Sequence, residues 1–249
     1  MCSANSLRIT FLPTRPKRST KSSTPPAIIR PIDASRLKTY PLQRRHSKVQ
    51  VSNFAKVWTK GRSFARFLDS LPDILAVKTL REVAKAIAKA HRNGKPVIVG
   101  MGAHVVKVGL GPLLVDLMER GIVTALAMNG AVIIHDFELA FMGHTSEEVD
   151  EEIDSGRFGM AEETGRMLNE AITLGMKEGQ GLGESLGSYI HRRKQLFPHR
   201  ATSLLATGFR LGLPVTVHVA VGTDIIHMHP SADGAAIGAG SLLDFRRLA

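Results

Sequence analysis

Polar residues that could do chemistry follow three short apolar segments of this chain. The segments cover positions 96–99, 123–128 and 214–221, and a glycine follows each of them within two residues. The residues that follow are Gly102 and His104 after the first segment, Asn129, Gly130, His135 and Asp136 after the second, and Thr223, Asp224, His227 and His229 after the third. Imidazole and carboxylate groups transfer protons and bind charged ligands, while glycine lets a ligand approach the backbone closely. These residue types favour a binding or catalytic site.

The three segments predict one composite site if the apolar runs are neighbouring parallel strands. In an open parallel α/β sheet, ligands bind outside the carboxyl ends of the strands, where the following loops converge. We therefore expect His104, Asn129, His135 and Asp224 to lie close together, although they are far apart in the sequence. We expect Asp224 to be the main anionic group of the crevice.

Strand-like and helix-like segments alternate along the second half of the chain. Apolar runs predict strands at 96–100, 123–128 and 214–221, and helical spacing predicts helices at about 107–120, 133–141, 146–154, 160–174, 201–211 and 240–248. Thr145 and Glu148 form a capping-box pattern that predicts the start of the acidic helix 146–154. The alternation indicates an α/β fold with a Rossmann-like, mostly parallel sheet and helices on both faces.

The positive charge is concentrated near the N-terminus. Residues 1–62 contain 14 Lys and Arg but one acidic residue, Asp33, whereas residues 63–249 contain 19 basic and 21 acidic residues. We expect a disordered basic tail at 1–32, a basic lead-in with two helices separated by Pro72 at 33–94, and the Rossmann-like domain at 95–249. Because the domain is nearly neutral, nucleic-acid binding by it is not expected.

The composition of the N-terminal segment leaves two interpretations. Residues 1–32 are rich in Ser, Thr, Pro, Lys and Arg, which fits a disordered tail and also resembles an organellar transit peptide. We favour the tail. Cys2 is the single cysteine, so an intrachain disulfide is excluded and a reducing, cytoplasmic location is expected. The chain has no apolar run of the length that a membrane helix needs, about 20 residues.

Each candidate group also has a simpler structural interpretation. Gly100-Met-Gly102 is half of a dinucleotide-binding fingerprint, but Val105 stands where the third glycine would be. Taken alone, the pattern favours a plain tight turn. His135 and Asp136 could act as acid and base, or His135 could be a hydrogen-bonded histidine of a partly buried helix.

The cluster after the third segment leaves a further alternative. His218, Asp224, His227 and His229 could bind a metal ion and serve a hydrolase or lyase, although no helical metal motif accompanies them. We favour contacts of Asp224 and the imidazoles with a cationic or nicotinamide-type ligand, and assign no metal ligand.

The three clusters, taken in order, resemble the deoxyhypusine synthase family. In the places of its TSNLISSGI, TTAGGVEED and IPVFSPALTDGSLGD segments this chain has 102–110, 127–136 and 213–229. The shared identities are Gly109, Gly130, Val132, Asp136 after a one-residue shift, Pro214, Val215, Thr223 and Asp224. The resemblance covers about 95–249 and implies a Rossmann-like fold, NAD as cofactor and a homo-oligomer, a tetramer in that family.

The resemblance also implies a reaction and site residues. Its members transfer an aminobutyl group from spermidine to a lysine of translation initiation factor 5A. We therefore expect an NAD-dependent transferase that acts on a polyamine and transfers the group to an acceptor protein. The alternative is a non-catalytic relative that only binds the ligand. Expected catalytic residues are His135, Asp136, His227 and His229. Expected NAD-binding residues are Gly102, His104, Asn129, Gly130, Thr223 and Asp224, of which Gly130, Thr223 and Asp224 match the family's segments directly.

The chain departs from that family at several positions. Ala103, Lys107 and Val108 replace serines that line NAD, and the paired glutamates of the second segment are replaced in the Ile133-Ile134-His135 stretch. The lysine that carries the aminobutyl group has no counterpart in this sequence.

Overall fold

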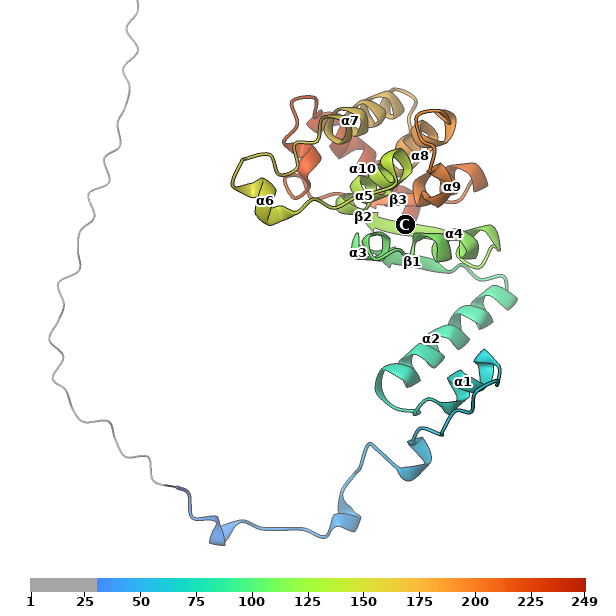
Figure 1. Cartoon of the computed structure of the whole chain (residues 1–249), viewed down its shortest axis with the longest axis vertical. Helices are drawn as coiled ribbons and strands as arrows, with labels where there is room; N and C mark the ends of the chain where they lie inside the picture. The colour runs from blue at the N-terminus through green and yellow to red at the C-terminus, as the bar shows by residue number, and fades with distance from the viewer. Residues whose placement is uncertain (1–30) are drawn as a thin grey trace, which may run out of the picture. The chain divides into compact units, whose positions relative to one another are not determined.

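The computed structural model describes residues 31–249, so most of the expected tail at 1–32 lies outside the described residues. The chain divides into a unit of residues 1–48 and a unit of residues 49–249. In the first, residues 31–48 are exposed and form two short 3-10 helices, Ala34–Arg36 and Leu42–Arg44. The second unit contains the sheet and all of the described α-helices (Figure 1).

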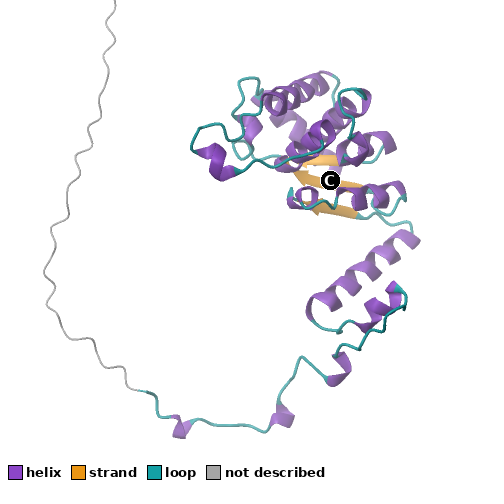
Figure 2. Cartoon of the chain, in the orientation of Figure 1, coloured by secondary structure: helices purple, strands orange, loops and turns teal. Residues whose placement is uncertain are grey.

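The second unit alternates strands and helices, as the sequence predicts (Figure 2). Its strands are β1 (Ile98–Met101), β2 (Ala125–Asn129) and β3 (Val215–His218). Its α-helices are α1 (Phe64–Ser70), α2 (Leu75–Arg92), α3 (His104–Lys107), α4 (Gly111–Glu119), α5 (Gly130–Met142), α6 (Val149–Ile153), α7 (Glu162–Lys177), α8 (Leu182–Arg192), α9 (Leu204–Leu211) and α10 (Gly234–Leu248). Short 3-10 helices cover Val51–Asn53, Arg200–Thr202 and Ile225–His227.

The three strands form one parallel sheet in the order β1-β2-β3. Ile98 pairs with Ala125, and Leu126 pairs with Val215, so the strands run side by side in the same direction. Helices α8 and α10 pack against β3 and helix α5 against β2 (Figure 1). The predicted fold class, a Rossmann-like α/β fold, is confirmed.

Several predicted helices have other boundaries in the structure; the helix expected at 240–248, for example, begins at Gly234. The segment 107–120 is split into α3 and α4, because Gly109 adopts a left-handed φ of 83° and Pro112 lies in the first turn of α4. The acidic helix expected at 146–154 is shorter and begins at Val149. The capping box expected from Thr145 is not formed, since Glu148 is the N-cap residue and the Thr145 hydroxyl bonds elsewhere.

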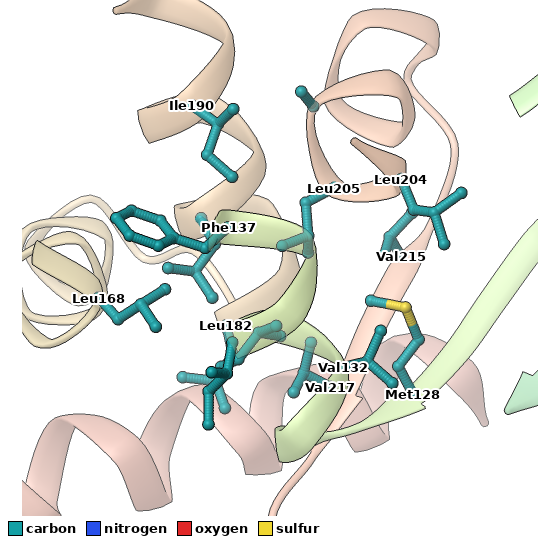
Figure 3. Packing of buried hydrophobic residues seen from close by; sticks show 14 of the residues in the cluster. Met128, Val132, Phe137, Leu168, Leu182, Ile190, Leu204, Leu205, Val215 and Val217 are labelled. Carbon is teal, nitrogen blue, oxygen red and sulfur yellow. The ribbon is translucent and has the colours of Figure 1, made fainter. Parts of the chain in front are cut away.

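The core lies between β2, β3 and helices α5, α7, α8 and α9. Phe137 of α5 and Phe197 are fully buried, and their rings meet edge to face with centroids 5.3 Å apart. Figure 3 shows Val132 and Phe137 from α5 among side chains from the two strands and the neighbouring helices. Helix α5, which follows β2 without a loop, is therefore fixed by the core along most of its length.

Helix α10 covers the free edge of β3 with side chains. The buried Asp244 carboxylate accepts the backbone N–H groups of Val217, at 2.8 Å, and of Gly183, at 2.9 Å. Ser241 accepts the N–H of Val219 at 3.1 Å. Burial raises the pKa of Asp244 above its ordinary value, and the two N–H donors oppose that shift. Asp244 therefore joins β3, α8 and α10 through one carboxylate.

Replacing Asp244 should destabilise the fold. Asp244→Ala leaves two buried N–H groups without their acceptor, and each such loss costs about 1–3 kcal/mol. We expect the free energy of unfolding, measured by urea denaturation, to fall by at least about 2 kcal/mol. Arg246→Ala, at an exposed position of the same helix, is the matched control and should change it little. Equal losses in the two variants would contradict this role of Asp244.

No helix among residues 31–249 combines the length and the apolar character that crossing a membrane requires.

Candidate functional site

The carboxyl ends of β2 and β3 bring two of the sequence clusters together. Asn129 ends β2 opposite His218 of β3, and Asn129 is also the N-cap residue of α5. The segment after β3 then passes over the first turn of α5. A Cβ atom at Gly130 would overlap the Asp224 carboxylate, so Asp224 lies directly against this glycine. The expected convergence of the second and third clusters is therefore found.

A cavity of about 180 Å³ lies at this edge of the sheet. Its titratable lining groups are Lys107, His135, Glu138, Glu147 and Asp224, and its other lining residues are Ala131, Ile134, Ser146, Val149, Phe158, Thr223 and Ile225. Of the residues expected from the sequence, the cavity contains His135, Thr223 and Asp224. His104 is exposed on α3 and Asn129 is exposed at the end of β2; neither lines the cavity.

Asp224 is the carboxylate of the cavity with the fewest hydrogen bonds. Its side chain is 7 % exposed and receives a long bond of 3.5 Å from the Thr223 hydroxyl. Burial raises the pKa of Asp224 above its ordinary value, while His227 and the Thr223 bond act in the opposite direction. By contrast, Glu138 accepts two hydroxyl groups, and Glu147 accepts the backbone N–H of Gly159.

His227 stands beside Asp224 with a defined ring orientation. Its Nδ1 accepts the backbone N–H groups of Gly222, at 3.1 Å, and Asp224, at 3.3 Å. Because Nδ1 is an acceptor, the proton of the neutral ring is on Nε2. Nε2 is buried, has no hydrogen-bond partner among residues 31–249, and lies 4.0 Å from Oδ2 of Asp224. The pair thus places an N–H donor next to a carboxylate.

His135 is held by a chain of side-chain hydrogen bonds. Its Nδ1 lies 2.7 Å from the hydroxyl of Thr145, which also bonds the Glu138 carboxylate. The other oxygen of Glu138 accepts the hydroxyl of Thr164 at 3.0 Å. Burial lowers the pKa of His135 below its ordinary value; Glu138 opposes this, while Lys107 and His104 lower it further. A neutral imidazole near pH 7 is suited to accept a proton.

A second cavity, of about 320 Å³, adjoins the first. The two cavities share Glu138, Ser146 and Glu147, so the segment after α5 lies between them. Ser146 has a φ of 76°, a left-handed conformation that is costly for a residue other than glycine. Together the cavities reach the size of small-molecule sites, roughly 300–1,000 Å³.

Asp136, expected to be catalytic, lies outside both cavities in the core. Its carboxylate accepts the hydroxyl of Ser203, at 2.5 Å, and the backbone N–H groups of Leu204, at 2.7 Å, and Leu205, at 3.3 Å. These donors form the start of α9. Burial raises the pKa of Asp136 to about 6, and the three donors oppose that shift. The contacts are those of a group that connects α5 to α9.

His229 and Gly102 also lie away from the cavity lining. His229 packs on Gly165 of α7, and its ring nitrogens lie 2.7 Å from the Ser231 hydroxyl and 3.4 Å from Glu162. At Gly102, a Cβ would have Asn129 as its neighbour, at 3.7 Å from Nδ2. The ends of β1 and β2 therefore lie side by side. That Gly102 and Asn129 bind a cofactor stays a prediction.

The histidines and acids do not assemble a metal site in the described part of the chain. No group of three or more His, Cys, Asp or Glu side chains there could hold a metal ion. His218 bonds the Thr216 hydroxyl at 2.9 Å, and His227 and His229 bond different partners. Sequence spacing alone suggested their grouping, but the turn at Ile225–His227 directs the two imidazoles to separate surroundings.

The backbone at the end of β1 is not crowded by neighbouring atoms. No atom lies within 4 Å of where a Cβ would stand at Gly100, and at Gly102 the approach of 3.7 Å is ordinary contact. The parallel order β1-β2-β3 is that of one mononucleotide-binding half of a Rossmann fold. The short α3 and the missing third glycine depart from the fingerprint. The fold is compatible with a nicotinamide cofactor, and the open backbone fits its close approach.

Sequence reasoning missed several residues of the cavity. Glu147 and Phe158 come from the segment between α5 and α7, and Thr145 was expected to cap a helix. Of the missed residues, Glu138 could have been found from the sequence. It comes three residues after His135, so on a helix the two side chains lie on the same face.

No family model matches the chain, and no curated protein matches it. Among solved structures, a protein described as LOR/SDH from Methanococcus maripaludis S2 is similar with a TM-score of 0.40 and 15 % identity, over 84 % of this chain and 53 % of that chain. The chain thus spans about half the length of that protein.

The expected membership in the deoxyhypusine synthase family is wrong. The similar structure bears the name of a different family. The segment aligned with that family's second loop is instead the first turns of α5, where Ile133 and Ile134 are buried in the core. The expected transfer of an aminobutyl group from spermidine, which depended on that family, is wrong as well.

The pKa of Asp136 predicts a measurable pH dependence of stability. With a folded pKa of about 6 and an unfolded pKa near 3.9, the folded state holds a proton between these values that the unfolded state has lost. Asp136 therefore lowers stability as the pH rises from about 4 to about 6. Asp136→Asn, which cannot ionise, should be more destabilising at pH 4.5 than at pH 7, by about 1–3 kcal/mol in urea denaturation.

Asp69→Asn, at an exposed position of α1, is the control and should show no such difference. A cost of Asp136→Asn that is equal at both pH values would show that the carboxyl has an ordinary pKa in the folded state.

Proposed function

We propose that this chain binds a small molecule carrying an ammonium group at the carboxyl ends of β2 and β3, and that His135 accepts a proton from it. The observation that carries the proposal is the lining of one cavity by Asp224, Glu138 and Glu147 with a single lysine, Lys107. This balance of charges favours a cation. The cavity volume of about 180 Å³ favours a small ligand or one end of a longer one.

Asp224 is the group proposed to hold the ammonium. The other two carboxylates already accept hydrogen bonds from hydroxyl or backbone donors, whereas Asp224 has one long bond. A charge-assisted hydrogen bond to a partly buried carboxylate is among the stronger polar contacts in proteins. Apolar groups of Ile134, Val149 and Phe158 line the same cavity and would pack against the carbon skeleton of the ligand.

His135 is proposed as the base because its pKa is lowered by burial and it faces the same cavity. The lowered pKa keeps the ring neutral near pH 7, so that a nitrogen lone pair is free to accept a proton. Lys107, on the neighbouring α3, supplies a positive charge that would stabilise negative charge developing on the ligand.

A nicotinamide dinucleotide is proposed as the cofactor, bound over the end of β1. The open backbone at Gly100 and Gly102 and the parallel order of the three strands support this. When bound, such a cofactor accepts or donates a hydride. The exposed Asn129 amide, next to Gly102, is proposed to bond the ribose or phosphate of the cofactor.

Replacing Asp224 should weaken amine binding. With n-butylammonium as the probe, Asp224→Asn should raise the dissociation constant roughly 10- to 100-fold, the equivalent of about 1.5–3 kcal/mol. Ligand-observed NMR titration measures this, with 1-butanol as the uncharged analogue. Asp116→Asn, at an exposed position of α4, should bind the probe like the unaltered protein. Equal affinity for the amine and the alcohol would overturn the proposal.

Replacing Gly102 should weaken nucleotide binding without unfolding the protein. The added methyl group of Gly102→Ala meets one protein atom at ordinary contact distance but occupies the space proposed for the nucleotide. We expect NAD affinity, measured by calorimetry, to fall at least about tenfold with an unchanged melting temperature. Gly238→Ala, where a Cβ also meets open space, is the matched control. Unaltered protein that fails to bind NAD would contradict the assignment.

A further inference from the structure

The hydroxyl of Thr145 stands between the proposed base and a carboxylate. Its Oγ1 lies 2.7 Å from Nδ1 of His135 and donates to Oε2 of Glu138. His135 and Glu138 lie one turn apart on α5. Thr145 lies outside the helices, in the connection between α5 and α6. The three groups therefore form a chain in which a residue from outside the helix links two residues on its face.

The direction of both hydrogen bonds among His135, Thr145 and Glu138 follows from counting their protons. A hydroxyl group has a single proton, and an ionised carboxylate can only accept. Since the Thr145 proton goes to Glu138, Oγ1 must accept the second bond, and the Nδ1 of His135 must donate it. The neutral ring then has its proton on Nδ1. Nε2, which has no hydrogen-bond partner among the residues that the structure describes, is left with a free lone pair.

We propose that Thr145 is a positioning residue that fixes the proton of the neutral His135 ring on Nδ1 and so keeps Nε2 available as the base. This rests on the proposed function for the role of His135. When Nε2 accepts a proton from the ligand, the ring becomes a cation, and Glu138 stabilises it through the Thr145 hydroxyl. Thr164 from α7 holds the other oxygen of Glu138 at 3.0 Å, which fixes the carboxylate in place.

The neutral rings of His135 and His227 therefore have opposite tautomers. Two backbone N–H groups donate to Nδ1 of His227, so that ring has its proton on Nε2. In His135, Nδ1 is the donor. The same site then contains one histidine suited to accept a proton and one suited to donate a hydrogen bond beside Asp224.

The tautomer of His135 is measured directly by long-range ¹H–¹⁵N correlation NMR of the full ¹⁵N-labelled chain. Spectra at pH 8 report the neutral ring, because burial lowers the pKa of His135. The groups that face this ring are Glu138 on its own helix, His104 and Lys107 on α3, and Asp224 and Glu147 across the cavity. His135→Gln identifies the signals by their loss.

We expect the unaltered protein to show a protonated Nδ1 and an unprotonated Nε2 at His135. Thr145→Val, which keeps the shape and removes the hydroxyl, should exchange the two nitrogen shifts or average them. Thr145→Ser should restore the original pattern. An Nε2–H form in the unaltered protein, or an unchanged pattern in a folded Thr145→Val, would overturn the proposal.

A second variant covers the case in which Thr145→Val does not fold. In Glu138→Leu no carboxylate accepts the Thr145 proton, so the direction of the hydroxyl is no longer fixed and the two nitrogen shifts should average. An unchanged Nδ1–H pattern in Glu138→Leu would also overturn the proposal. These spectra need no ligand, so a failure of amine binding would refute the proposed function and leave this test unaffected.

Discussion

The contact between Gly130 and Asp224 is the constraint on which the arrangement of the site depends. Helix α5 begins directly at the end of β2, and the segment after β3 folds back over its first turn. Any side chain at position 130 would occupy the place of the Asp224 carboxylate. The absence of a Cβ therefore lets two strand-end segments, about ninety residues apart in the sequence, close over one cavity.

Two other buried carboxylates hold the elements around that contact. Asp136 connects α5 to the start of α9, and Asp244 connects α10 to β3 and α8. Burial of each carboxylate costs desolvation energy, which raises its pKa. The backbone N–H groups that donate to it offset part of this cost and oppose the shift. Such groups resemble catalytic acids in a sequence, since they are isolated acids near apolar strands. Their surroundings distinguish them from Asp224, which lines a cavity.

The sequence predicted the three strands, the fold class and the convergence of His135 with Asp224, because apolar runs mark the strands and the carboxyl ends of parallel strands lie at one edge of a sheet. It could not predict that Thr145 leaves its capping position, since that depends on Glu138 and His135 competing for the hydroxyl. Nor could it separate His227 from His229, because the turn between them decides their partners. The family resemblance failed for a related reason: short matches around glycines reflect the demands of strand-end turns as much as shared chemistry. The expected homo-oligomer and domain boundaries stay predictions.

The segment from Gly143 to Ala161 connects the fold to the chemistry of the site. It contributes Glu147 and Phe158 to one cavity and, through Thr145, a hydrogen bond to His135. None of the residues of its helix α6 is buried, so the core does not fix it as it fixes α5. Glu147 bonds the backbone N–H of Gly159, and Gly159 packs against Ile225, so polar and apolar contacts both hold the segment. The proposed tautomer of His135 therefore depends on a residue from a segment that lacks the extensive core packing of α5.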